Sequence, residues 1–176
     1  MARSELPTLK IVASTDEPVS VEALYRRYAA YVATVGMRLL GRRDEAEDLV
    51  QDVFFDVHRQ LSGLQNPAAA KAWLRKIAVR KSIVRLRKRR VREWVGLDDG
   101  EAGEPSVAAS QDDRVAFLQL YRRLDRLPTQ QRVAWTLRRL DGMPLNDVAE
   151  ACGKSLATVK RWISSADEQL EELRPT

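Results

Sequence analysis

The sequence predicts an all-α protein made of two small helical domains joined by a flexible linker. Apolar side chains recur at three- and four-residue steps along most of the 176 residues, as on the buried face of an amphipathic helix. No stretch of useful length alternates apolar and polar residues as a half-buried strand would. A segment rich in Gly, Ser, Pro, Ala and acidic residues interrupts the helical pattern. We therefore divide the chain into a loose tail (1–20), a first domain (21–95), a linker (96–113) and a second domain (114–176).

Three helices are expected in the first domain. Their predicted spans are Val21 to Gly41, Asp44 to about Leu61, and about Lys71 to Arg90. Gly41 is a favourable helix stop, and Asp44 suits the positive end of the helix dipole. Residues 62–70 contain Gly, Asn and Pro as helix breakers, which predicts a loop. The inward face of the third helix is expected to hold Trp73, Leu74, Ile77 and Val84.

Four further helices are expected in the second domain. Helical periodicity resumes at Arg114, and Pro128 begins another helix at a favoured first position. Pro144 opens a short helix that runs through Ala151, and Gly153 lies in the tight turn before a last helix that runs to about Leu173. The buried set of the first of these helices is predicted to be Phe117, Leu118, Tyr121 and Leu124.

The distribution of charge predicts a surface for a polyanion. Between Lys71 and Arg92 there are eleven Lys and Arg residues and no Asp or Glu. The net charge is +5, so the rest of the chain, with 25 acidic against 19 basic residues, is net acidic. A basic run can also be the solvated face of a helix. A run of this length and purity favours a polyanion partner for one part of the chain and a different role for the other parts.

Several classes of protein are excluded by the composition. The longest charge-free stretch, 60–70, is eleven residues, whereas a membrane-spanning helix needs about 20 apolar residues. Cys152 is the single cysteine and His58 the single histidine, and no acidic cluster at metal-ligand spacing accompanies them. No phosphate-binding Gly-rich loop, catalytic triad or paired-acid site is present. We therefore expect a cytosolic, non-enzymatic protein with no cofactor, metal or membrane insertion. Of the four tryptophans, Trp73 and Trp135 are expected in the core, whereas stacking on bases remains open for Trp94 and Trp162.

Residues 145–170 have the layout of a helix-turn-helix. The last helix is predicted to bury Val159, Ile163 and Ala166 together with Leu170 and Leu173, which fall within one narrow sector. The pattern alone is equally compatible with a plain helical hairpin. The opposite face is small, polar or basic, as a helix in a DNA major groove requires. Its members are Ala157, Thr158, Lys160, Arg161, Ser164 and Ser165.

The second predicted helix has an acidic outward face that contains one phenylalanine. With Leu49, Val53 and Phe54 facing inward, the exposed Phe55 is surrounded by carboxylates. An exposed aromatic residue with a charged rim is typical of a protein contact. An acidic solvated helix with a single exposed apolar residue explains the pattern equally well. The full outward set is Glu45, Asp48, Gln51, Asp52, Phe55 and Asp56.

The segment from Leu127 to Leu170 resembles the C-terminal DNA-binding domain of the extracytoplasmic-function (ECF) sigma factors. The shared marks are Leu127-Pro128, Leu140-Asp141-Gly142, Val148-Ala149-Glu150, Gly153 and Thr158-Val159-Lys160. The resemblance implies that this domain binds the −35 promoter element. Trp162 and Ser165 depart from the family, which commonly has basic residues at both positions, so the grip on phosphates or the preferred sequence is expected to differ. The implied −35 contacts are Thr158, Lys160, Arg161, Ser164 and Ser165.

The segment EAEDLVQDVF, Glu45 to Phe54, is similar to the most specific motif of the same family. It implies that Asp48, Gln51, Asp52 and Phe55 bind the clamp helices of the largest polymerase subunit. The segment Trp73 to Arg90 resembles the part that opens and reads the −10 element, with the preceding loop cupping a flipped base. Arg80 and Val84 stand where relatives usually have Asn and often have Asp. The implied −10 contacts are Gln65, Asn66, Lys76, Arg80, Lys81, Arg87 and Lys88.

The resemblance implies a transcription initiation factor that brings RNA polymerase to promoters. It covers about Val21 to Leu173, with both halves in register. The implied partners are core RNA polymerase and promoter DNA, and an anti-sigma factor is a further candidate because family members are often held by one. The alternative is a helix-turn-helix regulator that acts without docking on polymerase, which would need no acidic helix.

Overall fold

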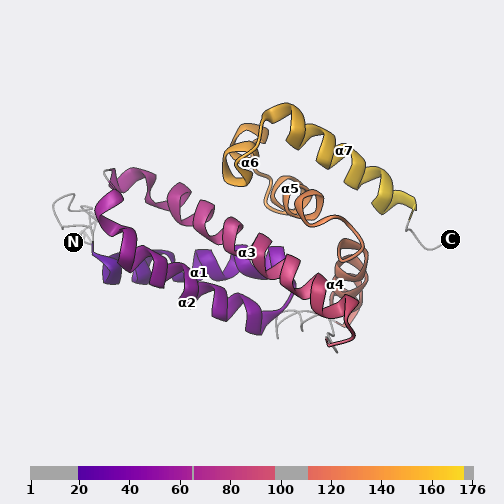
Figure 1. The fold of residues 1–176 in the computed structure, drawn as a ribbon, viewed down its shortest axis with the longest axis horizontal. Coiled ribbons are helices and arrows are strands. Elements are labelled where there is room, and N and C mark those ends of the chain that lie inside the picture. The colour runs from indigo at the N-terminus through magenta and orange to yellow at the C-terminus, as the bar shows by residue number, and fades with distance from the viewer. Residues whose placement is uncertain (1–19, 65, 98–110, 173–176) are drawn as a thin grey trace, which may run out of the picture.

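The all-α fold class is confirmed by a computed structural model of the chain, which describes residues 20–64, 66–97 and 111–172 (Figure 1). No strand occurs within these residues. None of their helices is sufficiently long and apolar to cross a bilayer. The helices are α1 (Val21–Leu40), α2 (Arg43–Gln60), α3 (Ala70–Trp94), α4 (Gln111–Leu124), α5 (Thr129–Arg139), α6 (Leu145–Cys152) and α7 (Leu156–Glu172), with short 3-10 turns at Leu61–Gly63 and Pro67–Ala69.

Helices α1, α2 and α3 pack side by side around an apolar core. The side-chain hydroxyl of Ser20 accepts a hydrogen bond from the Ala23 amide at 3.1 Å and so caps the start of α1. Gly41 ends α1 in the left-handed conformation, as the sequence predicts. The core of this half consists of fully buried aliphatic side chains, chiefly Val32, Leu39, Leu49, Val53, Val57, Leu74 and Val79.

The second half contains the predicted helix-turn-helix. Helix α6 ends at Gly153, whose φ of 63° is the left-handed conformation that the tight turn into α7 requires. Pro144 precedes α6 as its N-cap residue, and Pro128 precedes α5 in the same way, each one residue outside the helix that it was expected to begin. The buried face of α7 is the predicted one over the residues described: Val159, Ile163, Ala166 and Leu170.

The two halves pack against each other. Figure 1 shows α5, α6 and α7 on one side of α3, with α4 near its C-terminal end. Val133 and Leu137 of α5 and Val148 of α6 belong to the same continuous apolar cluster as the core of α1, α2 and α3. The predicted linker, 96–113, begins with Gly96 in a turn, and its residues 98–110 lie outside the described part of the chain.

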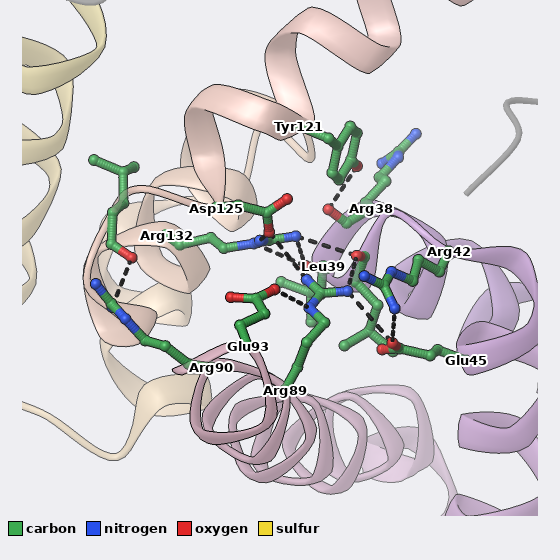
Figure 2. A network of polar contacts seen from close by, with 12 residues as sticks. Arg38, Leu39, Arg42, Glu45, Arg89, Arg90, Glu93, Tyr121, Asp125 and Arg132 are labelled. Carbon is green, nitrogen blue, oxygen red and sulfur yellow. Dashed lines mark hydrogen bonds and ion pairs between the residues drawn. The ribbon is translucent and has the colours of Figure 1, made fainter. Parts of the chain in front are cut away.

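A buried polar network joins the halves at the C-terminal end of α1 (Figure 2). The guanidinium of Arg132 donates to the carbonyl oxygen of Leu39 at 3.1 and 3.2 Å and to that of Leu40 at 3.2 Å. Arg89 donates to the Leu40 carbonyl at 3.1 Å, and both arginines pair with Asp125. The last carbonyls of a helix have no partner within the helix, so these arginines supply it from α3 and α5.

Tyr121 of α4 completes the packing against the end of α1. Its hydroxyl donates to the carbonyl oxygen of Arg38 at 2.8 Å, and burial raises the pKa of this phenol to about 12. A Cβ atom at Gly41 would lie 2.2 Å from the Tyr121 ring. A glycine at this position is therefore required both by the left-handed backbone and by the close approach of the ring.

Three predictions about helix boundaries and faces need correction. Helix α3 continues four residues past Arg90 to Trp94, and α4 begins at Gln111 rather than Arg114. Val84 was predicted to face inward, but its side chain is 46% exposed. The inward face of α3 moves around the helix after Val79, because the second half of α3 also packs against α5. The buried positions there are Ser82, Leu86 and Arg89.

Candidate nucleic-acid and protein interfaces

The acidic face of α2 and the basic face of α3 line one groove of about 750 Å³. Within it, Asp52 pairs with Arg85, whose guanidinium also lies 4.0 Å from the Asp48 carboxylate. Asp56 pairs with Lys81 at 2.8 Å. The two surfaces that the sequence predicts for different partners are thus adjacent, and their charges partly compensate each other across the groove.

The outward face of α2 carries the four residues predicted to contact polymerase. Asp48, Gln51, Asp52 and Phe55 are all exposed, and the Phe55 side chain is 62% exposed. The guanidinium of Arg59 lies 5.9 Å from the centre of the Phe55 ring, a distance at which a cation and an aromatic ring attract each other. This face therefore presents an aromatic side chain rimmed by carboxylates.

Two carboxylates predicted for the outward face of α2 are turned away from it. Glu45 is half-buried and pairs with Arg89 and Arg42 at 3.4 Å, at the edge of the network in Figure 2. Asp56 is half-buried against Lys81. Both side chains lie on the flank of α2 that packs towards α3, and there they neutralise basic residues.

The residues predicted to contact the −10 element differ in their surroundings. Lys76 forms an ion pair with Glu150 of α6 at 2.7 Å, and this bond and charge lower the pKa of the Glu150 carboxyl. Lys81 is paired with Asp56. Three others, Arg80, Arg87 and Lys88, are exposed and have no acidic partner within the described residues.

The loop before α3 holds the remaining two predicted −10 contacts. The Asn66 side chain is exposed, and its carbonyl oxygen accepts a hydrogen bond from the Ala68 amide at 2.9 Å, which caps the 3-10 turn. Gln65 lies outside the described residues. Asn66 therefore shapes the start of the loop that leads into α3.

Helix α7 presents three of its five predicted contacts to solvent: Lys160, Arg161 and Ser164. The other two are half-buried. The Thr158 amide donates to the Ser155 hydroxyl at 3.2 Å, and the two hydroxyls lie 2.9 Å apart, so these residues cap the start of α7. The Ser165 hydroxyl accepts from Gln169, which in turn donates to Gln131 of α5. The open face of α7 is therefore the Lys160–Arg161–Ser164 row.

The remaining residues of interest lie mostly where the sequence places them. Trp73 and Trp135 are half-buried and pack on the core, and the Trp135 indole donates to Asp167 at 2.8 Å. Trp162 also packs on the core, whereas Trp94 is 86% exposed. Cys152 is half-buried, and burial raises the pKa of its thiol to about 11.

Sequence reasoning missed the residues that join the halves. Arg89, Arg132, Asp125 and Tyr121 form the network of Figure 2, yet only Tyr121 belongs to a predicted apolar face. Hydrophobic periodicity carries no signal for a buried arginine, because the partners that make its burial tolerable are distant in sequence.

These surfaces define a class of protein: an all-helical chain with a helix-turn-helix in one half and an acidic helix beside a basic helix in the other. The family described as Sigma-70 region 2 matches residues 24–92, and Sigma-70 region 4 matches residues 117–170.

Relatives identify the family. The ECF RNA polymerase sigma factor EcfG of Rhodopseudomonas palustris is 30% identical over 137 residues, which are 77% of this chain and 74% of EcfG. The ECF RNA polymerase sigma factor SigE of Mycolicibacterium smegmatis is 29% identical over 157 residues, 87% of this chain but 61% of SigE. The sigma factor RpoE of Bartonella quintana, solved with the anti-sigma factor NepR, has a TM-score of 0.66 at 26% identity, covering 86% of this chain and 94% of RpoE. The chain belongs to the ECF group of RNA polymerase sigma factors.

Proposed function

We propose that the chain is a transcription initiation factor that binds core RNA polymerase, recognises −35 and −10 promoter elements and supports melting of the duplex. The observation that carries this proposal is the pairing of surfaces on one chain. Helix α2 presents the exposed Phe55 beside carboxylates that line a groove with the basic face of α3, and α7 presents a separate basic row. A regulator acting without polymerase would have no use for the first of these surfaces.

We propose a division of labour between the two halves and the polymerase. Residues 21–95 dock on polymerase through Asp48, Gln51, Asp52 and Phe55 and hold the −10 strand on α3. Residues 114–176 read −35 duplex with α7. Polymerase supplies all catalysis, so the chain itself is not an enzyme and acts in the cytoplasm where transcription takes place. An anti-sigma factor is a further proposed partner, since the similar RpoE was solved with one.

The energetics of melting explain why both surfaces belong in one protein. Opening a duplex costs about 1.4 kcal/mol per base-pair step in stacking, and a transcription bubble spans several steps. One basic helix, part of whose charge is already paired within the chain, offers too few contacts to offset that cost. Polymerase bound to α2 adds the missing contacts.

The test is permanganate footprinting of unpaired thymines on a promoter mapped after overexpression of the chain. Chain plus core polymerase should make thymines near −10 reactive and start RNA downstream, whereas the chain alone should leave them protected. Reactive thymines with the chain alone, or none when core polymerase is added, would contradict initiation as the function.

A further inference from the structure

The C-terminal end of α3 holds basic charge that the rest of the chain does not compensate. Earlier along the helix, Lys76, Lys81 and Arg85 are paired with carboxylates of α6 and α2. The buried Arg89 is also paired, with Glu45, Glu93 and Asp125. Beyond Leu86, Arg87, Lys88 and Arg92 have no acidic partner within the described residues, and Arg90 donates only to the Leu127 carbonyl at 3.2 Å. The end of α3 is therefore the part of the helix best able to attract an anion.

The same end of α3 is unusually apolar for an exposed surface. Val91 is 62% exposed and Trp94 is 86% exposed. Val95 and Leu97 extend this exposed apolar surface. Arg87, Arg90, Val91 and Trp94 follow the i, i+3, i+4, i+7 spacing that places side chains on one face of a helix. Together with Thr129 of α5 they line an open hollow of about 400 Å³.

This arrangement combines the two features that single-stranded nucleic acid needs. Arginines attract the phosphates, and the flat indole offers a face on which a base of any type can stack. The side chains around Trp94 are mainly basic, and Arg87, Lys88 and Arg92 have no acidic partner within the described residues, so this end of the helix attracts a polyanion. Charge complementarity thus favours a strand of nucleic acid over a protein surface.

We propose that Arg87, Arg90, Val91 and Trp94 form a stacking site for a single DNA strand, with Trp94 against a base and the two arginines against phosphates. The proposal rests on the proposed function, because the strand would be the continuation of the one held by the rest of α3. Trp94 lies beyond the residues that match Sigma-70 region 2, which end at 92. Arg87, Arg90 and Val91 lie within that match, so the stacking side chain is the part of the site that the family match does not cover.

The deciding experiment measures binding of fluorescein-labelled dT20 to the full chain by anisotropy at low salt. Trp94→Ala should weaken binding about 5- to 150-fold, as expected for the loss of one stacked base. Trp94→Phe should retain most of the affinity because a ring face remains. Arg87→Ala should reduce the slope of log K against log salt by about 0.7, the value for one phosphate contact on a single strand. Because Trp94 is so exposed, circular dichroism melting should show the variants to be folded.

Comparison with polymerase binding separates this proposal from the proposed function. Phe55→Ala should weaken association with core polymerase and leave the dT20 affinity unchanged, whereas Trp94→Ala should do the reverse. Wild-type chain that fails to bind dT20, or Trp94→Ala that binds it as well as wild type, would overturn the stacking site. Trp94→Ala that loses polymerase affinity or self-association and keeps its dT20 affinity would show that a protein covers this surface, and would also overturn it.

Discussion

Arginine side chains have two opposite roles in this chain. Arg89 and Arg132 are 6% and 3% exposed and serve the fold by binding Asp125 and the last carbonyls of α1. Burial lowers the pKa of the Arg132 guanidinium. The carboxylate of Asp125 acts in the opposite direction and so stabilises the charged form of the arginine. Arg87 and Arg161, in contrast, are exposed and have no acidic partner within the described residues. The burial and the ion pairs of each arginine, rather than its residue type, decide whether it is available to bind a nucleic acid.

Asp52→Lys combined with Phe55→Ala should weaken association with core polymerase more than tenfold. Both side chains are exposed, and a surface ion pair such as Asp52–Arg85 contributes only about 0–1 kcal/mol, so the stability of the fold should change little. Sedimentation of chain with core polymerase measures the association. Glu171→Lys, an exposed change of the same kind of charge at the far end of α7, is the matched control and should bind as wild type. Normal association of the folded double variant would place the docking surface elsewhere.

Arg161→Ala should weaken binding of the polymerase-bound chain to −35 duplex and leave polymerase association intact. Arg161 lies in the open row of α7, so the variant loses a contact to a phosphate or to a base. For a base contact the expected loss is about 1–3 kcal/mol of binding free energy. Gel shifts at moderate salt measure the affinity. Arg122→Ala, an exposed arginine on α4, should have no effect. Equal affinities for the two variants would reject Arg161 as a contact.

The Cys152 thiol should react about a hundredfold more slowly with Ellman's reagent at pH 8 than a thiol with the ordinary pKa of 9.0. Burial raises its pKa to about 11, and only the thiolate reacts. The stabilising effect of the neutral buried thiol is complete below pH 9 and is lost as the pH rises towards 11. Rates measured between pH 7 and 10 should rise tenfold per unit. The same chain in guanidinium is the control, and equal rates in both states would contradict the burial.

At the scale of elements, the C-terminal end of α1 is the point on which the packing converges. Its last carbonyls accept hydrogen bonds from Arg89 of α3, Tyr121 of α4 and Arg132 of α5. A buried carbonyl that loses its hydrogen-bond donor destabilises the folded state by the full free energy of its desolvation. Helices from both halves of the sequence therefore depend on this one helix end.

Arg132→Met should lower the free energy of unfolding by about 1–3 kcal/mol, the usual cost of leaving a buried carbonyl such as that of Leu39 without its donor. Methionine fills similar space but cannot donate to Leu39 or neutralise Asp125. Denaturation by urea measures the change. Arg122→Met, on the exposed face of α4, should stay within about 0.5 kcal/mol of wild type. A similar small effect at Arg132 would mean that the network contributes little to the fold.

Local signals predict the helices well, and they fail where tertiary contacts take over. Gly41 and Gly153 mark helix ends in the sequence and adopt the left-handed conformation in the structure. The exposed Phe55 follows from the period of α2. Val84 was misplaced because the buried face of α3 depends on the helices packed against it, which periodicity in α3 cannot reveal. The turning of Ser165 towards Gln169 and Gln131 likewise depends on α5.

At the scale of the molecule, the acidic residues of α6 face the basic face of α3. Glu150 lies 2.7 Å from Lys76, and Asp147 lies 3.8 Å from Arg75. Together with Asp52 and Asp56 of α2, these carboxylates pair with basic side chains of α3, which under the proposed function would contact phosphates. Under the proposed function, the chain would compete with DNA for part of its own basic helix. We therefore predict that the chain alone binds DNA weakly.

Removing the two α6 carboxylates should therefore strengthen DNA binding by the isolated chain. In the variant Asp147→Asn with Glu150→Gln, Arg75 and Lys76 are released for up to two further phosphate contacts. Each contact adds about 0.9 to the magnitude of the slope of log K against log salt on duplex DNA. The expected result is several-fold tighter binding at low salt with a slope steeper by up to about 2.

Net charge must be separated from position, because the variant also makes the chain more positive by two charges. The matched control, Glu171→Gln with Glu172→Gln, makes the same change in charge at the far end of α7. Long-range attraction would strengthen binding equally in both variants and is screened beyond about 10 Å at 0.1 M salt. A steeper slope only for the α6 variant, measured by anisotropy on a duplex of unrelated sequence, would assign the effect to the α3–α6 ion pairs. Equal slopes in the two variants would contradict the competition.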